Sequence, residues 1–498
     1  MSSRVILALD QGTSGTTALL VDADGRVVAR GYAELTQYYP QPGWVEHDPE
    51  EIWTTMAAAG RQAMAEARVT GSEIAAVGIT NQRETTIVWE RSTGAPIHHA
   101  IVWQCRRTAA MCEALKAEGA EPLVRERTGL VVDAYFSGTK IAWLLDHVPW
   151  ARKRAERGEL AFGTVDSWLV WKLTGGRVHV TDATNASRTL CLGLRSVAWD
   201  DEMLARLTIP REVLPTVVDS SGPIAETSDL GWLPAGVPIA GIAGDQQAAL
   251  IGQACFQPGM AKSTYGTGCF LLLNTGEGAV TSANRLLTTP AYRIGGRIAY
   301  ALEGSIFVAG AAVKWLRDGL KIIESASQTA TLAAPLPYDH GVYLVPAFVG
   351  LGAPHWAPNA RALLCGLTFN ASAAHLARAT LESVAYQTLD LTEAMQRDGA
   401  QRLDAIRIDG GMAANDWFCQ FLADILHAHV ERPAELETTA LGAAFLAGLA
   451  TGVWPDLASI SGCWCTTAVF EPAMNPAQRA ALVAGWREAL ARTLHVAR

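Results

Sequence analysis

The stretch VILALDQGTSGTTALLVDADG, residues 5–25, decides the fold that we expect for this chain. Residues 5–10 form an apolar run that stops at an acid, and residues 11–16 form a loop of small and hydroxyl-bearing residues. A second apolar run covers residues 17–21, and Asp24-Gly25 is typical of a hairpin turn into a third strand. The pattern predicts consecutive strands with a small-residue loop between the first two.

A helix is expected directly after these strands. Asp48 is a favourable capping residue, Pro49 suits the first helical position, and Glu51 stands three residues after the cap. This spacing predicts a capping box, in which the carboxylate of Glu51 reaches back to the start of the helix.

The same order of elements returns near the middle of the chain. Residues 237–243 form an apolar run that ends in Gly244-Asp245, and residues 248–254 have the composition of a helix. A strand at 260–264 then leads into a second small-residue loop, YGTG at 265–268. Similar units in each half suggest two lobes that face each other across a cleft.

The length of the chain also favours two large domains. At 498 residues it exceeds what one hydrophobic core usually serves. Apolar residues make up 49% and charged residues 18%, as in a well-buried globular enzyme rather than a disordered chain. We place the boundary near residue 250, which gives one lobe over 1–250 and another over 251–498.

Helices dominate the remainder of the second half. Residues 374–397 have apolar side chains at helical spacing, and residues 403–408 predict a strand that leads into the DGG segment at 409–411. Asn415 is expected to begin a further helix that runs to about residue 428. Residues 440–450 are rich in Ala and Gly, which predicts close packing against a neighbouring element.

Charge and hydropathy exclude several classes of protein. The net charge of −9, without a long run of Lys or Arg, argues against a nucleic-acid partner. The N-terminal apolar run is too short for a signal peptide, and no stretch approaches the roughly 18 apolar residues of a membrane span. The nine cysteines are scattered and favour neither a disulfide framework nor a zinc site. We therefore expect a soluble cytoplasmic protein.

The chain has no GxxxxGK[ST] motif, which excludes phosphate binding by a P-loop. Two small-residue loops are the candidates instead. The first loop contributes Thr13, Ser14 and Gly15, and the second contributes Thr267. In both, backbone N–H groups can converge on phosphate oxygens. One such loop is also a common turn, but two in opposite halves, each accompanied by an acid after a strand, favour phosphate binding.

The two acids suit phosphoryl transfer. Asp10 stands beside the first loop and is a candidate partner for Mg²⁺. Asp245 begins the helix predicted in the middle of the chain and is a candidate to accept the proton of an attacking hydroxyl. For either residue the alternative is an ordinary turn or helix cap, and for Asp245 capping and catalysis are compatible.

A third polar cluster follows the strand predicted at 75–79. Arg83 supplies a fork of donors and Glu84 a pair of acceptors, which suits a hydroxylated, uncharged ligand. The alternative is a surface salt bridge. Aromatic side chains that could cover the carbon face of such a ligand are Trp103, Tyr135 and Phe270, although taken singly each is more often a core residue.

Together these segments resemble the glycerol kinases of the FGGY carbohydrate kinase family. The resemblance covers essentially the whole chain, and its segments keep their order and spacing. It rests on DQGT (10–13), NQRETT (81–86), AIVWQ (100–104), YFSGTK (135–140), GIAGDQQ (241–247), YGTGC (265–269) and DGG (409–411).

The resemblance implies an α/β fold of two actin-like, ribonuclease-H-like lobes with a central cleft for nucleotide and substrate. It implies transfer of phosphate from ATP to glycerol, with Mg²⁺, to give sn-glycerol 3-phosphate as the first step of glycerol catabolism. Similar enzymes are commonly dimers or tetramers, so a homo-oligomer is expected.

The resemblance also implies roles for individual residues. Glycerol would be held by Arg83, Glu84, Trp103, Tyr135, Asp245, Gln246 and Phe270. The nucleotide would meet Thr13, Ser14, Gly15, Thr267, Gly310, Lys314, Gly411 and Asn415. Asp10 and Asp245 would serve Mg²⁺, and Asp245 would take the proton.

Three positions depart from the family pattern. Thr17 stands where glycerol kinases commonly carry an Arg, and Lys314 stands where a Gln is common near the adenine. Glycerol kinases that respond to fructose 1,6-bisphosphate resemble one another in a Gly-rich loop followed by an Arg. The corresponding stretch here, GWLPAGV at 231–237, has no cation, so we expect no such inhibition through it.

Two other functions remain open. Another FGGY kinase would act on a pentulose, erythritol or a gluconate-like substrate, and the absence of an Arg at Thr17 leaves room for it. A non-kinase actin-like ATPase would couple the nucleotide to conformation, but a pocket with Arg83, Glu84 and Tyr135 would have no purpose there. ATP turnover with and without glycerol separates the kinases from the ATPase.

Overall fold

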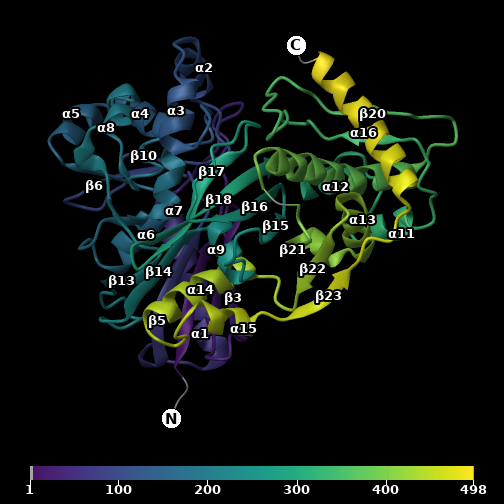
Figure 1. The fold of residues 1–498 in the computed structure, drawn as a ribbon. Helices are drawn as coiled ribbons and strands as arrows, with labels where there is room; N and C mark the ends of the chain where they lie inside the picture. The colour runs from purple at the N-terminus through teal and green to yellow at the C-terminus, as the bar shows by residue number, and fades with distance from the viewer. Residues whose placement is uncertain (1–3, 401, 497–498) are drawn as a thin grey trace.

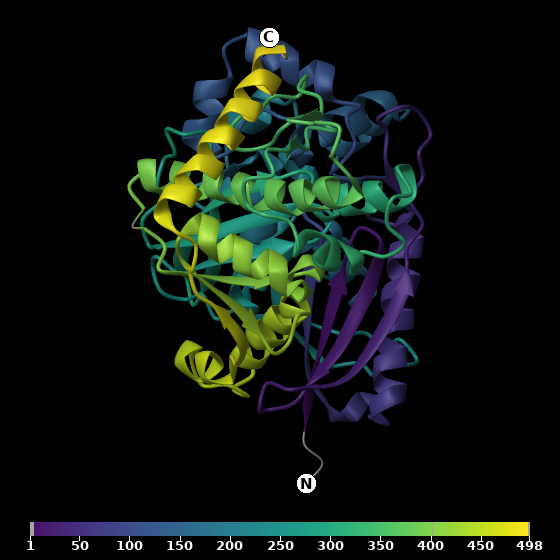
Figure 2. The ribbon, with the colours of Figure 1, turned by 90° about the vertical axis from the view of Figure 1, so that its right-hand side faces the viewer.

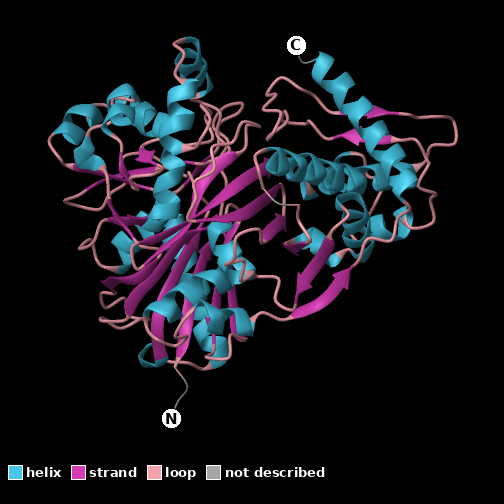
Figure 3. Cartoon of the chain, viewed as in Figure 1, coloured by secondary structure: helices cyan, strands magenta, loops and turns pink. Residues whose placement is uncertain are grey.

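The computed structural model describes residues 4–400 and 402–496, and one mixed sheet runs through them (Figures 1 and 3). Within the described residues the sheet has 13 strands in the order β23-β22-β21-β15-β16-β18-β17-β13-β14-β5-β1-β2-β3. Strands of the first half of the chain fill one side of this order, and strands of the second half fill the other. The two sides meet where β13 (Ser221–Glu226) runs parallel to β17 (Leu287–Ile294), and a single residue pair, Ser221 with Ile294, forms that junction.

The first side of the sheet is built as the opening stretch of sequence predicts. The strands β1 (Val5–Gln11), β2 (Gly15–Val21) and β3 (Val27–Glu34) form an antiparallel meander, whose residues from β1 and β2 are largely buried. β5 (Ile74–Asn81) pairs in parallel with β1, and β14 (Pro238–Gly244) pairs in parallel with β5. The carboxyl ends of β1, β5 and β14 therefore lie at the same edge of the sheet.

The second side repeats a short meander flanked by parallel strands. Here β15 (Ala261–Tyr265) pairs with β16 (Cys269–Gly276), and β16 pairs with β18 (Arg297–Ile306). The strand β21 (Ala405–Asp409) runs parallel to β15 and ends at the same edge. The outer strands are β22 (His429–Pro433) and β23 (Thr466–Phe470).

Short strand pairs and helices complete the fold. The short strands are β4 (Glu46–His47), β6 (Ile87–Glu90), β7 (Ala100–Ile101), β8 (Leu160–Gly163), β9 (Val180–Asp182), β10 (Leu192–Gly193), β11 (Ala198–Trp199), β12 (Thr216–Val218), β19 (Tyr343–Val345) and β20 (Leu363–Cys365). The shorter helices are α2 (Ala109–Ala117), α3 (Glu121–Thr128), α4 (Ser137–His147), α5 (Ala151–Glu156), α6 (Val165–Leu173), α7 (Ala183–Ala186), α8 (Asp201–Arg206), α10 (Gly310–Lys314), α11 (Gln328–Ala333) and α15 (Leu457–Cys463). No helix between residues 4 and 496, as far as these are described, is both long and apolar enough to cross a membrane.

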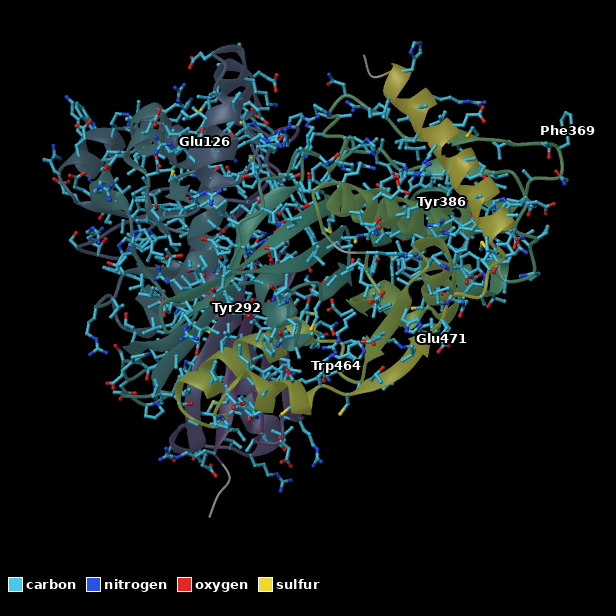
Figure 4. The ribbon with its side chains drawn as sticks, in the orientation of Figure 1. Glu126, Tyr292, Phe369, Tyr386, Trp464 and Glu471 are labelled. Atoms are coloured by element: carbon cyan, nitrogen blue, oxygen red, sulfur yellow. The ribbon has the colours of Figure 1, made fainter. Side chains whose placement is uncertain are left out.

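Three helices cover the strands that come from the second half of the chain. In Figure 2 the long helix α12 (Ala373–Arg397) lies above α13 (Asp416–Leu426), and α16 (Pro476–Val496) crosses them. Tyr386 of α12 stacks on Trp486 of α16 with ring centroids 5.4 Å apart. Figure 4 shows the contrast between Tyr386 in this core and Phe369, which projects fully exposed from the tip of the β20–α12 loop.

Two helices pack against each other at the centre of the molecule. They are α9 (Asp245–Gly252) and α14 (Thr438–Ala450), and both lie beside the first-half strands in Figure 1 although α14 comes from the second half. A Cβ atom at Gly442 would fall on the carbonyl oxygen of Ala248, and one at Gly252 would fall on that of Thr438. The close packing predicted for residues 440–450 is therefore confirmed.

The structure corrects one local prediction. Asp48 caps α1 (Pro49–Ala67), and its side chain accepts from the N–H of Glu50 at 2.9 Å. Glu51 does not complete a capping box, because its Oε1 accepts from the N–H and the hydroxyl of Thr36 at 3.0 and 2.7 Å. Glu51 therefore accepts from Thr36, which follows β3, instead of from the backbone N–H of Asp48 at the start of the helix.

Candidate active site

A cleft of about 1190 Å³ lies at the strand ends where the two sides of the sheet face each other. The first half contributes residues that follow β1, β5 and β14. The second half contributes the loop after β15, the helix α10, and the segment from Gly411 that follows β21. Each side therefore presents a loop directly after a buried strand.

Most of the residues singled out from the sequence line this cleft. Those expected to hold a polyol are Arg83, Glu84, Trp103, Tyr135, Asp245, Gln246 and Phe270, and all of them do so. Those expected to meet a nucleotide that also line it are Thr13, Ser14, Thr267, Gly310, Lys314, Gly411 and Asn415. Asp10 and Gly15 lie just behind the lining, at the end of β1 and the start of β2. Contact with a ligand remains a prediction for every one of these residues.

Arg83 is the centre of a buried ionic cluster. Its side chain is 2% exposed, and its two terminal nitrogens donate to Glu303 at 2.7 and 2.9 Å. Further donors reach Gln247 Oε1 at 3.1 Å and the hydroxyl of Tyr135 at 3.4 Å. Because Glu84 is only 1% exposed as well, the alternative of a surface salt bridge for Arg83 and Glu84 is wrong.

A second arginine balances the charge of this cluster. Arg188 Nε donates to Glu84 Oε1 at 2.6 Å, and its terminal nitrogens reach Glu303 at 3.1 and 3.3 Å. Burial alone would raise the pKa of Glu303, but Arg188 and Arg83 lower it to about 2. Burial raises the pKa of Glu84, and the same two arginines offset part of that rise. Two guanidinium groups and two carboxyl groups thus pair with one another beside the cleft.

Aromatic rings form one wall of the cleft and join it to the first loop. Trp103 makes edge contacts with Tyr135 and Phe270, with ring centroids 5.7 and 6.3 Å apart. The indole N–H of Trp103 donates to the hydroxyl of Thr13 at 2.8 Å. The wall expected to cover a polyol is therefore hydrogen-bonded to the loop expected to bind phosphate.

Backbone contacts hold the two small-residue loops against their neighbours. In the first loop the N–H of Gly12 donates to the carbonyl of Gly15 at 2.9 Å. In the second, the carbonyl of Thr267 accepts from the N–H groups of Ala309 and Ala311 at 2.9 and 3.0 Å. A Cβ atom at Gly310 would lie 2.7 Å from the carbonyl oxygen of Gly266, so only glycine allows α10 to start this close to the loop.

Asp245 presents a carboxylate to the cleft. Gly244 is the N-cap of α9 and Asp245 is its first residue, so Asp245 does not cap the helix. Oδ1 accepts from the N–H of Gln246 at 2.7 Å and lies 3.2 Å from Arg83 Nε, while the side chain is 30% exposed. Within the described residues Oδ2 has no hydrogen-bond donor, so it is available to a ligand in the cleft.

Asp10 faces other acids rather than a cation. Burial and the neighbouring carboxylates of Asp245 and Glu437 raise the pKa of Asp10 well above its usual range. A divalent cation would relieve this repulsion, and carboxylate oxygens are the ligands that Mg²⁺ prefers. No three His, Cys, Asp or Glu side chains converge as metal ligands in the described part of the chain. Mg²⁺ held by one or two carboxylates and substrate phosphates needs no such group.

Sequence reasoning missed several side chains that support the cleft from behind. They are Lys140, Arg188, Gln247, Lys262 and Glu303. Glu303 carried a signal, because it is the only acid in β18 and follows the run IAYAL at 298–302. Lys262 is fully buried and donates to Gln246 Oε1 at 2.6 Å and to the hydroxyl of Thr264 at 2.8 Å. Lys262 is buried because β15 lies between β16 and β21, and the sequence around Lys262 did not predict this position.

Comparisons with known proteins agree over almost the whole chain. Models of the FGGY family of carbohydrate kinases match residues 5–252 with the N-terminal domain and residues 261–451 with the C-terminal domain. A glycerol kinase of Gluconobacter oxydans is 58% identical over 98% of this chain and 95% of its own length. A glycerol kinase of Carboxydothermus hydrogenoformans is 56% identical over 99% of this chain and 98% of its own.

Solved structures show the same fold. The Plasmodium falciparum glycerol kinase with ADP superposes with a TM-score of 0.91 at 37% identity, over 99% of this chain and 98% of that one. A gluconate kinase from Lactobacillus acidophilus gives a TM-score of 0.89 at 22% identity, over 99% of this chain and 98% of that one. The second likeness bears on the fold alone.

Proposed function

This chain belongs to the FGGY family of carbohydrate kinases, and from that membership we propose that it transfers phosphate from ATP to glycerol, giving sn-glycerol 3-phosphate and ADP. The observation that carries the proposal is the buried pair Arg83 and Glu84, in which Arg83 lies beside Asp245 and the ring of Phe270, in a cleft that Trp103 also lines. Such a pocket offers donors and acceptors to hydroxyl groups and an aromatic face to carbon atoms, which suits a small uncharged polyol.

The carboxylate of Asp245 is the group placed to activate the hydroxyl. Oδ1 is held by Arg83 and the N–H of Gln246, which leaves Oδ2 to accept the proton as the oxygen attacks. A placed general base contributes about 10²–10⁴ in rate. With the hydroxyls of glycerol held by Arg83, Glu84 and Tyr135, the attacking oxygen would approach the terminal phosphate in line with the leaving oxygen of ADP.

The nucleotide would lie between the two small-residue loops, largely against the second half. Thr13, Ser14, Gly15 and Thr267 would meet the phosphates through backbone N–H groups and hydroxyls. Gly310, Lys314, Gly411 and Asn415 would surround the remainder of the nucleotide. Asp10, through water, and Asp245 would hold Mg²⁺, whose charge neutralises the phosphate oxygens during transfer.

A second candidate is an FGGY kinase for another polyol or sugar. Thr17 favours it, because glycerol kinases commonly carry an Arg there and Thr17 pairs with Asp10 across β1 and β2. The decisive experiment measures ATP consumption with glycerol, dihydroxyacetone, erythritol, ribulose and xylulose. The proposal expects glycerol to give the highest kcat/KM and expects little turnover without an acceptor. Equal hydrolysis without any acceptor would instead support the conformational ATPase.

We further propose the lobe division at about residue 250, giving 1–250 and 251–498, together with a homo-oligomer of two or four chains. A cytoplasmic location is proposed because ATP is supplied there. Sedimentation at several protein concentrations would test the oligomer.

A further inference from the structure

Lys140 is a buried cation without a carboxylate partner. Its side chain is fully buried in α4, and no ion pair joins it to an acid within the described residues. Its Nζ donates only to backbone carbonyls, those of Tyr135 at 2.5 Å and Glu84 at 3.3 Å. Burial lowers the pKa of Lys140 to about 8, although the charge of Glu84 offsets part of the effect. Burying an ammonium group without an ion-pair partner costs free energy of folding.

Both carbonyls belong to residues that line the cleft. Glu84 has a φ of 60°, a left-handed conformation that residues other than glycine rarely adopt. Its carbonyl oxygen accepts from three donors, Ser137 Oγ at 3.0 Å, Thr86 Oγ1 at 3.1 Å and Lys140 Nζ. The chain is therefore held in an unfavourable conformation at the residue that presents its carboxylate to the cleft.

The side chain of Glu84 is held separately. Arg188 Nε donates to Oε1 at 2.6 Å while the other end of the same guanidinium is fixed to Glu303. Neither Arg188 nor Lys140 lines the cleft. One residue thus fixes the backbone of Glu84 from behind, and the other fixes its carboxylate.

We propose that Lys140 and Arg188 are positioning residues of the polyol pocket, Lys140 through the carbonyls of Glu84 and Tyr135 and Arg188 through the carboxylate of Glu84. The inference rests on the proposed function, in which Glu84 accepts a hydrogen bond from a substrate hydroxyl. A displaced carboxylate would bind the hydroxyl less well in the ground state and the transition state alike, which raises KM and leaves kcat unchanged. Loss of either positioning residue therefore weakens the use of the polyol and leaves the nucleotide side unaffected.

The first test is Lys140→Met, which removes the charge and keeps a flexible stem of similar length. Because a buried, unpaired charge is removed, we expect Tm to stay the same or to rise. The glycerol KM is expected to rise roughly 10- to 100-fold, with the KM for ATP unchanged and kcat at saturating glycerol within about twofold. A purely structural role predicts a lower Tm and no selective effect on glycerol.

The second test is Arg188→Lys, which keeps the charge but cannot reach Glu84 and Glu303 at once. It is expected to raise the glycerol KM by at least about tenfold. The matched control is Arg378→Lys, because Arg378 is also buried and donates to Glu382 at 2.7 Å, in α12 of the second half. The control is expected to lower Tm and to leave the glycerol KM unchanged.

The outcomes separate the inference from the proposed function. If the unchanged chain uses another polyol in place of glycerol, the proposed substrate is wrong and the same KM comparison is made with that polyol. The inference fails if Lys140→Met keeps the original KM for the polyol. It also fails if Arg378→Lys raises that KM as much as Arg188→Lys does, or if Lys140→Met lowers Tm as far as the control.

Discussion

At the residue scale, the proposed reaction depends most on the carboxylate of Asp245. In Asp245→Asn the amide keeps the shape of the side chain but cannot take a proton. We expect kcat to fall by about 10²–10⁴ while ADP binding, measured by calorimetry, stays within about twofold. Near-normal turnover in this variant would remove Asp245 from the role of base.

Lys140 gives a second prediction at this scale, concerning stability and pH. Its pKa in the fold, about 8, lies below the ordinary lysine value near 10.4, so the folded state loses the proton first. The unfolded chain then binds more protons between these values, and the contribution of Lys140 to the free energy of unfolding rises with pH across that window. Below pH 8 both states are protonated and its destabilising effect is fully present.

The measurement compares the unchanged chain with Lys140→Met in urea unfolding from pH 7 to pH 10.5. The variant should be more stable at pH 7, and the difference should shrink by up to about 3 kcal/mol as the pH rises. Cys105, Cys112, Asp133 and Glu84 surround the ammonium group and are present in both proteins, so their own titration cancels to first order. A difference that does not change with pH would contradict the prediction.

Individual residues of the cleft differ in how far the sequence could predict them. Arg83, Glu84 and Asp245 follow buried strands directly, so their place at a sheet edge was legible from the chain. Arg188 and Glu303 come from distant segments, which meet because residues 187–189 pack beside β17, the neighbour of β18. The sequence marks Glu303 as a lone acid in a strand, but nothing in it shows which residues Glu303 and Arg188 contact. The family and its two-lobed α/β fold, which the sequence also predicted, are confirmed.

At the element scale, the crossing of α9 and α14 bears on both stability and turnover. Gly442→Ala would place a methyl group on the carbonyl of Ala248, in the helix whose first residue is Asp245. We expect a loss of about 1–3 kcal/mol in the free energy of unfolding and a lower kcat, because α9 must shift to make room.

The matched control for this prediction is Gly462→Ala in α15, where a Cβ atom meets nothing within 4 Å. It should leave both quantities unchanged or raise stability slightly, since Ala favours a helix over Gly. If the two substitutions changed the free energy of unfolding equally in urea, close packing between α9 and α14 would not be the cause of the loss.

Elements were predicted better than their ends. The Ala- and Gly-rich composition of residues 440–450 indicated close packing, because small side chains have few other uses in a buried helix. The capping box at Glu51 was wrong, because the partner that wins, Thr36, lies in a loop whose position depends on β3 and α1 together. The spacing of residues along the chain shows which nearby groups a side chain can reach. It does not show whether a hydrogen-bond partner from a distant segment will be preferred.

At the scale of the whole molecule, regulation by fructose 1,6-bisphosphate is expected to be absent from the 231–237 loop. That stretch lacks a cation, and its Trp232 packs against α1, where a Cβ atom at Gly60 would lie 2.9 Å from the indole ring. An aromatic side chain in this position offers no charge to a phosphate group.

The measurement is glycerol-dependent turnover with up to millimolar fructose 1,6-bisphosphate. We expect less than about twofold inhibition, since a phosphate site without a charge-assisted donor is weak. Strong inhibition that disappears when residues 231–237 are replaced would contradict the expectation.

The single residue pair that joins β13 to β17 has a mechanical consequence. Within the long sheet the two halves are joined only at Ser221 and Ile294 among the described residues, whereas α14 of the second half also packs on β1, β5 and β14 of the first. A rotation about this pair would break few backbone hydrogen bonds of the sheet, and its cost would lie in the contacts that cross between the halves, such as those of Arg83 and Arg188 with Glu303. Such a rotation would suit a kinase, because the two halves could close over the cleft and exclude water before each phosphate transfer. They could then reopen without unfolding any strand.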